Sequence, residues 1–110
     1  MSVKKSTLRV REWRRKKKME ELANMTSYNF LKYIEPKLDS LHGKAIIGHG
    51  YSWTDEILEI FIHKTEILDV KFKVEELENY KKIIFYLSSP NDRILCYEYV
   101  MDKIKRMKGR

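Results

Sequence analysis

The sequence predicts a small α+β or α/β domain, in which N-terminal helices and one C-terminal helix cover a mixed sheet of about four strands. Two patterns carry this prediction. Near both ends of the chain, apolar residues recur every three or four positions, as on one face of a helix. Between them lie short runs rich in β-branched and aromatic residues, as in strands. The length of 110 residues fits one domain covering residues 1–110.

The first predicted element is a basic helix over about residues 9–24, preceded by a mobile basic lead at residues 1–5. Its apolar stripe is sparse and consists of Leu8, Val10, Trp13, Met19 and Leu22. Five consecutive cations, Arg14 to Lys18, repel one another at helical spacing, and few acids offset them. Such a helix favours an anionic partner.

A second helix is predicted after Asn24, Thr26 and Ser27, which are suitable capping residues. Its apolar positions are Phe30, Leu31, Ile34, Leu38 and Leu41. Pro36 lacks a backbone donor and crowds the preceding turn, which predicts a kink or a break at Glu35. Gly43 is expected to end the helix.

The middle of the chain predicts strands. Residues 45–47 form a short apolar run, and the Gly48–Gly50 segment is expected to turn after it. Residues 52–64 fit a helix, because Ser52 and Asp55 match a capping box, but their isoleucines favour a strand. We expect that strand to form a hairpin, turning near Lys64–Thr65, with the alternating segment Leu68–Val74.

The last strand and the last helix follow closely. Residues Ile83 to Leu87 are predicted to form a central strand. Pro90 and its polar neighbours then open a helix. Its predicted apolar stripe consists of Ile94, Tyr97, Met101 and Ile104.

Charge is segregated along the chain. Residues 1–24 hold nine Lys and Arg against three acids, and residues 103–110 hold five against none. The 78 residues between them hold nine against thirteen, which gives the net charge of +7. Basic segments at both ends are typical of phosphate binding, because neutralised phosphates release their counterions.

This pattern predicts a non-enzymatic nucleic-acid-binding protein with a basic N-terminal arm at residues 1–24. DNA and RNA are both open, and no sequence specificity is implied. Trp13 could stack on a base, and the cations would contact phosphates. The expected contact residues are Arg9, Arg11, Trp13, Arg14, Arg15, Lys16, Lys17, Lys18, Lys105, Arg106 and Lys108.

The main alternative is a protein–protein interaction module that binds an acidic partner or self-associates through its oppositely charged middle and ends. A homodimer is possible, because the terminal helix has apolar surface to spare. Glutamine is absent while Lys, Glu, Ile and Tyr are abundant, which suggests a viral or thermophilic source.

The N-terminal third resembles ribbon-helix-helix DNA-binding proteins. Residues 6–11 would form the ribbon, and residues 19–23 and the Ser27-capped segment would form the two helices. The resemblance implies that Thr7, Arg9 and Arg11 enter the major groove. It covers about forty residues, and it departs from the family because five cations stand where the family has buried apolar residues.

A third hypothesis is a metal-dependent nuclease. Asp55 and the Asp69–Lys71 segment resemble the pattern of restriction-like nucleases, in which carboxylates hold Mg²⁺ and a lysine supports the attacking water, and Glu35 would supply a further acid. In the expected hairpin, however, the two aspartates would lie roughly 17 Å apart.

The remaining reactive residues predict no further site. His42, His49 and His63 show no metal-ligand spacing, so neither a metal nor another cofactor is expected. The single cysteine, Cys96, is expected to be a buried apolar residue and fits a reducing compartment. Neither a signal peptide nor a membrane span is apparent, so the chain is predicted to be cytoplasmic, without a membrane partner.

Overall fold

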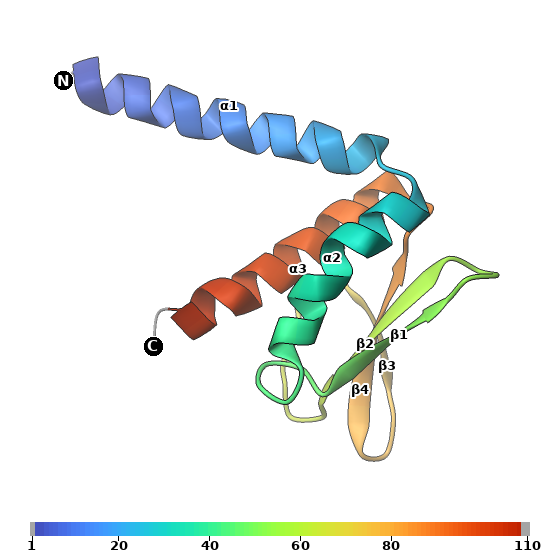
Figure 1. The fold of residues 1–110 in the computed structure, drawn as a ribbon. Coiled ribbons are helices and arrows are strands. Elements are labelled where there is room, and N and C mark those ends of the chain that lie inside the picture. Colours follow the sequence, from blue (N-terminus) through green and yellow to red (C-terminus); the bar gives the residue numbers. More distant parts are fainter. Residues whose placement is uncertain (1, 109–110) are drawn as a thin grey trace.

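A computed structural model describes residues 2–108, with side chains from residue 12 onward. Over this range the predicted order of helices and strands is confirmed, as Figure 1 shows. The elements are α1 (Ser2–Asn24), α2 (Ser27–Leu41), β1 (Gly48–Ser52), β2 (Ile57–His63), β3 (Lys73–Glu76), β4 (Tyr80–Tyr86) and α3 (Pro90–Lys108).

The four strands form one sheet in the order β1-β2-β4-β3. The fold is of the predicted α+β class. Every pair of neighbouring strands is antiparallel, however, so the prediction of a mixed sheet is wrong. Its strands are joined through hairpins and loops, without the helical crossover that parallel neighbours need. β4 is an interior strand, as predicted. Its Phe85 lies opposite Leu58 of β2, and both are buried beneath α2 and α3.

The predicted partner of β2 is wrong. β2 forms its hairpin with β1 and pairs on its other side with β4, while β3 pairs with β4 alone. Pairing with β4 aligns two strands that both bury alternate side chains. The segment expected to pair, residues 68–74, is mostly a loop, and its Phe72 packs edge-on against Phe85 and Tyr99.

The Gly48–Gly50 segment lies within β1 and not in a turn, which corrects the predicted strand at residues 45–47. The ring of Phe61 lies over this strand, at 3.8 Å from where a Cβ of Gly50 would stand, which is an ordinary van der Waals distance. The actual turn follows Ser52, whose hydroxyl accepts a hydrogen bond from the amide of Asp55. The capping-box pattern therefore shapes a hairpin turn.

α2 follows its prediction closely, except at Pro36. Thr26 caps the helix by accepting a hydrogen bond from the amide of Asn29, and every predicted apolar position is buried. Pro36 does not break the helix at Glu35. Pro36 and Lys32 both lie on the exposed side of α2. Water can therefore hydrate the Lys32 carbonyl, which has no amide donor at position 36. Gly43, at φ 75°, follows the end of the helix.

α3 buries a different face from the one predicted. Arg93, Cys96, Tyr99 and Val100 are buried, whereas the expected stripe beginning at Ile94 is half-buried. The predicted stripe leaves out Arg93 because a charged residue is rarely fully buried. Arg93, Cys96 and Val100 each precede a residue of the predicted stripe, so the buried face of α3 is rotated by one position from the predicted face.

The burial of Arg93 is explained by its hydrogen bonds. Its guanidinium donates to the carbonyls of Leu22 (2.8 Å), Ala23 (2.6 Å) and Leu87 (2.6 Å). Leu22 and Ala23 lie in the last turn of α1, where carbonyls lack helical partners and the helix dipole favours a cation. Arg93 thereby fixes the C-terminal end of α1 to the start of α3.

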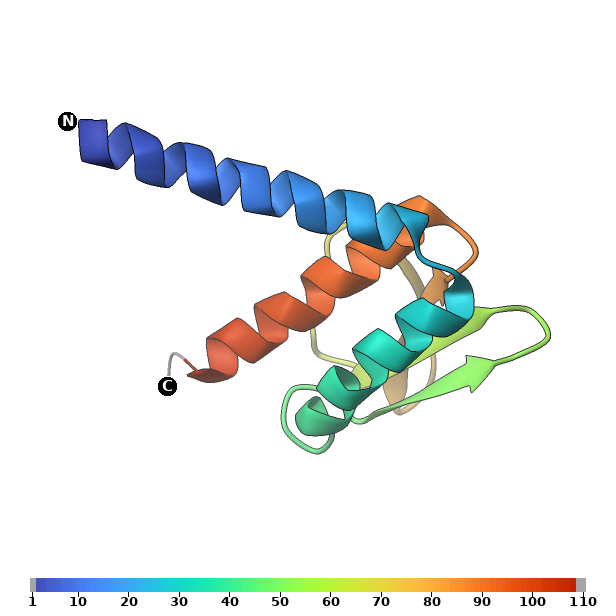
Figure 2. The same ribbon diagram turned by 45° about the horizontal axis from the view of Figure 1, so that its top comes forward.

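α1 begins at Ser2, so the predicted start near residue 9 is wrong, and residues 2–5 are helical instead of forming the expected lead. Residues 6–11 are helical and form no ribbon, and the ribbon-helix-helix resemblance therefore fails. Among the α1 side chains that are described, only Leu22 is buried. The helix meets the body at its C-terminal end and then extends away from it, diverging from α3 (Figures 1 and 2).

We predict that Arg93→Ala lowers the free energy of unfolding by about 3 kcal/mol or more, because the carbonyls of Ala23 and Leu87 lose the guanidinium donor. Arg93→Lys should also destabilise the protein, since a lysine ammonium lacks the planar fork of donors with which the guanidinium reaches three carbonyls. Urea denaturation of both variants measures the effect. A loss below about 1 kcal/mol for Arg93→Ala would contradict the structural role.

Candidate functional site

The exposed cations of α1 form a strongly basic surface. Side chains from Glu12 to Lys17 are all exposed. Within residues 12–108, Arg14, Lys16 and Lys17 make no ion pair, and Arg15 reaches Glu98 of α3 at 4.0 Å with 76% of its side chain exposed. An exposed pair at this distance contributes little, so these four cations remain available to a partner.

The cations lie around the helix and do not share one face. Arg14, Lys17 and Trp13 lie on one side of α1, and Arg15 and Lys16 lie on another side with Met19. Trp13 is 60% exposed, and the Lys17 Nζ lies 4.9 Å from the centre of its ring. The indole ring therefore makes a cation–π contact with Lys17 and does not pack in the core.

Lys18 differs from the cations before it, because it points towards the body. Its Nζ lies 3.4 Å from the hydroxyl of Tyr33 and 3.5 Å from Glu21. Burial by itself lowers the pKa of Lys18, but the hydrogen bond to Tyr33 and the nearby charge of Glu21 raise it overall. Lys18 thus helps to dock α1.

The C-terminal cations lie close to part of this surface. Lys105 and Lys108 of α3 line a groove between α3 and α1 together with Arg15. Arg106 is instead paired with Asp102 at 3.0 Å. The side chains of Arg9 and Arg11 lie outside the described residues. The structure thus brings three of the predicted contact residues, from opposite ends of the chain, to one groove.

Several carboxylates of the acidic middle pair with lysines of the same fold. Lys82 lies 2.9 Å from Glu59 and 3.4 Å from Glu75, joining three neighbouring strands on the outer face of the sheet. Glu66 accepts hydrogen bonds from Lys103 and from the hydroxyl of Tyr99. These carboxylates are therefore occupied by partners within the fold.

The side chains of the nuclease hypothesis have separate partners. Asp55 interacts with Ser52 in the β1–β2 turn, and Asp69 accepts a hydrogen bond from the amide of Lys71 in a different loop. Among side chains 12–108, neither aspartate belongs to a group of three or more potential metal ligands.

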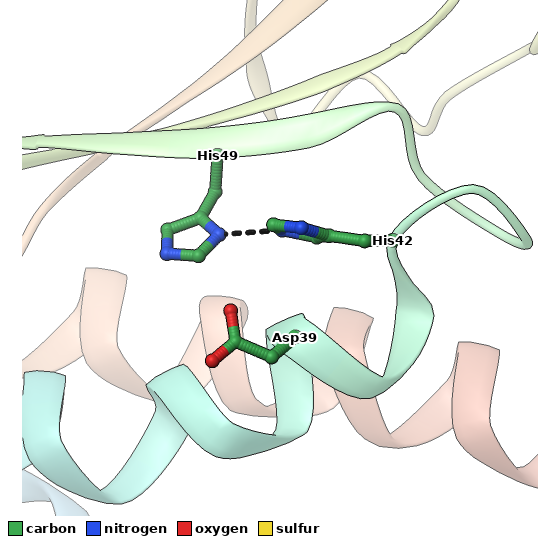
Figure 3. Close-up of side chains that lie close together, drawn as sticks. All are labelled: Asp39, His42 and His49. Atoms are coloured by element: carbon green, nitrogen blue, oxygen red, sulfur yellow. Dashed lines mark hydrogen bonds between the residues drawn. The ribbon is translucent and has the colours of Figure 1, made fainter.

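Such a group does exist elsewhere, and sequence analysis missed it. Asp39 at the end of α2, His42 just after it and His49 of β1 each bring a ligand atom within 4.8 Å of the others (Figure 3). His42 Nε2 lies 2.7 Å from His49 Nδ1, and His49 Nε2 lies 3.2 Å from Glu35 Oε2. The spacing of Glu35, Asp39 and His42 on one helix face was the available signal.

Cys96 is fully buried, as predicted. Burial, with a smaller effect of the Asp92 charge, raises the pKa of its thiol far above the usual range, so the reactive thiolate is disfavoured. It is no candidate nucleophile.

No protein-family model, curated protein or solved structure matches the chain. None of the helices described has both the length and the apolar character that crossing a bilayer demands. Function must therefore be inferred from the residues and their arrangement.

We predict that Cys96 reacts with a disulfide reagent such as dithionitrobenzoate only when the protein unfolds, because the sulfur is shielded and protonated. Thiol release should be negligible in buffer and complete in concentrated guanidinium. Rapid labelling of the native protein would contradict the burial of this side chain.

Proposed function

We propose that this protein binds nucleic acid by placing α1 against phosphates. The proposal rests on two properties of α1 taken together: the helix extends from the body, and several of its described cations make no ion pair. α1 extends from the body, and Arg14, Lys16 and Lys17 are exposed without carboxylate partners among the described side chains. Exposed lysines and arginines held on a preformed helix can each neutralise a phosphate and release its counterions.

The distribution of charge around α1 favours a groove over a flat surface. A helix with cations on several sides can contact the phosphates of both strands when it lies between them. The major groove of B-form DNA is wide enough for an α-helix, whereas that of A-form RNA is too narrow. Duplex DNA is therefore the nucleic acid that this arrangement suits best. Phosphate contacts provide affinity without sequence specificity.

The groove between α1 and α3 supports the same proposal. Lys105 and Lys108 extend the cationic surface beyond α1, although Glu98 and Asp102 lie in the groove too. Self-association of the middle with the basic ends is less favoured, because Glu59, Glu66 and Glu75 already bind lysines of their own fold. The proposal also includes that the protein resides in the cytoplasm.

The test is fluorescence anisotropy with labelled duplex DNA, single-stranded DNA and duplex RNA at several salt concentrations. We expect duplex DNA to bind tightest. Replacing Arg14, Lys16 and Lys17 together by Gln should weaken binding severalfold or more. It should also flatten the plot of log affinity against log salt by about 2 to 3 units, since each lost phosphate contact contributes roughly 0.9.

A matched control removes the same charge elsewhere. Replacing Lys44, Lys64 and Lys73 by Gln changes three exposed lysines outside α1 and α3. This variant should keep nearly the wild-type salt slope. Equal loss in both variants would show only a general effect of net charge, and absence of wild-type binding to all three nucleic acids would refute the proposal in favour of an acidic protein partner.

A further inference from the structure

We propose that Asp39, His42 and His49 form a binding site for a single divalent transition-metal cation, with Zn²⁺ as the expected ion. The site lies where the end of α2 meets β1 (Figure 3), and it involves none of the cations assigned to nucleic-acid binding. Two imidazoles and a carboxylate are a ligand set that zinc accepts in proteins.

The two imidazoles lie close enough together to share one cation. His42 Nε2 and His49 Nδ1 are 2.7 Å apart, which is a hydrogen-bond distance. Two nitrogens bound to tetrahedral zinc at 2.0–2.1 Å would be separated by about 3.3 Å. His42 and Asp39 are exposed, so the two rings can separate by this small difference, and the Asp39 carboxylate can move in from within 4.8 Å to complete the site. Zinc would replace the proton shared between the rings.

Glu35 supplies the feature that distinguishes this cluster from a chance meeting of polar side chains. Its Oε2 lies 3.2 Å from His49 Nε2, on the opposite edge of the ring from His42. When His49 Nε2–H donates to this carboxylate, the lone pair of Nδ1 is directed at the cluster. Metal-binding histidines commonly donate their second N–H to a carboxylate, which fixes the tautomer and strengthens the ligand.

The fold holds the central ligand in place. The His49 side chain is 9% exposed, and it comes from a strand that pairs with the core strand β2. Asp39 lies in the last turn of α2 and His42 is the residue directly after the helix, and their ligand atoms lie within 4.8 Å of each other. The site has one preorganised ligand and two that can adjust.

Three protein ligands leave a fourth position of a tetrahedral zinc ion open to water. Such a position is typical of zinc sites that activate water or accept a further ligand, whereas purely structural sites are usually closed by four protein ligands. Zinc would also join the end of α2 to β1 across the loop between them, so binding should stabilise the fold.

The experiment is a Zn²⁺ titration of the full chain in competition with a chromophoric chelator, with Co²⁺ absorption as a probe of ligand geometry. We expect one ion per chain and a rise in Tm with zinc. Asp39→Asn and His42→Ala should each weaken binding at least tenfold and reduce the rise in Tm. Both side chains are exposed, so the variants should fold. Glu35→Gln should weaken binding about tenfold through His49.

His63→Ala is the matched control, because His63 is the remaining histidine, is exposed and lies outside the cluster. It should bind zinc like the wild type. Equal binding by the wild type and the Asp39→Asn, His42→Ala double variant would overturn the site. So would a loss in His63→Ala as large as that in His42→Ala, or no zinc binding by the wild type.

Discussion

The arrangement of the molecule depends on one buried cation. Arg93 has 4% of its surface exposed and donates to three carbonyls, two of them in the last turn of α1. Leu22 is buried beside this contact, and Lys18 reaches Tyr33 one turn earlier. These contacts hold the C-terminal part of α1 against the body. The cationic part of α1 therefore extends into solvent from an end that is fixed to the body. The proposed nucleic-acid interface depends on this geometry.

Elements with a strong local pattern could be predicted from the sequence. The apolar spacing of α2 and the proline-led start of α3 both specify structure through near neighbours, and both were confirmed. Strand pairing could not be predicted in the same way. The choice of β4 as the partner of β2 depends on which two strands bury most apolar surface together, and they are separated by the loop and β3.

The candidate sites also consist of a part that a local sequence pattern predicts and a part that only the folded structure brings together. A run of cations such as Arg14–Lys18 is visible in sequence, and the structure adds that Lys18 is used within the fold. The histidine cluster was missed because residues 48–50 were predicted to form a turn, whereas His49 lies in β1 and faces the end of α2. Arg93 was missed because its partners are backbone carbonyls, two of them about seventy positions away in the chain, and such partners leave no signature in side-chain composition.

The most direct test of the account is an NMR titration of isotope-labelled protein with a short DNA duplex at moderate salt. The account predicts that backbone and side-chain signals of Arg14–Lys17 change most, with smaller changes at Lys105 and Lys108. Signals of the outer sheet face around Lys82 should stay in place, because that lysine is already paired. Changes centred on the sheet, or none on α1, would contradict it.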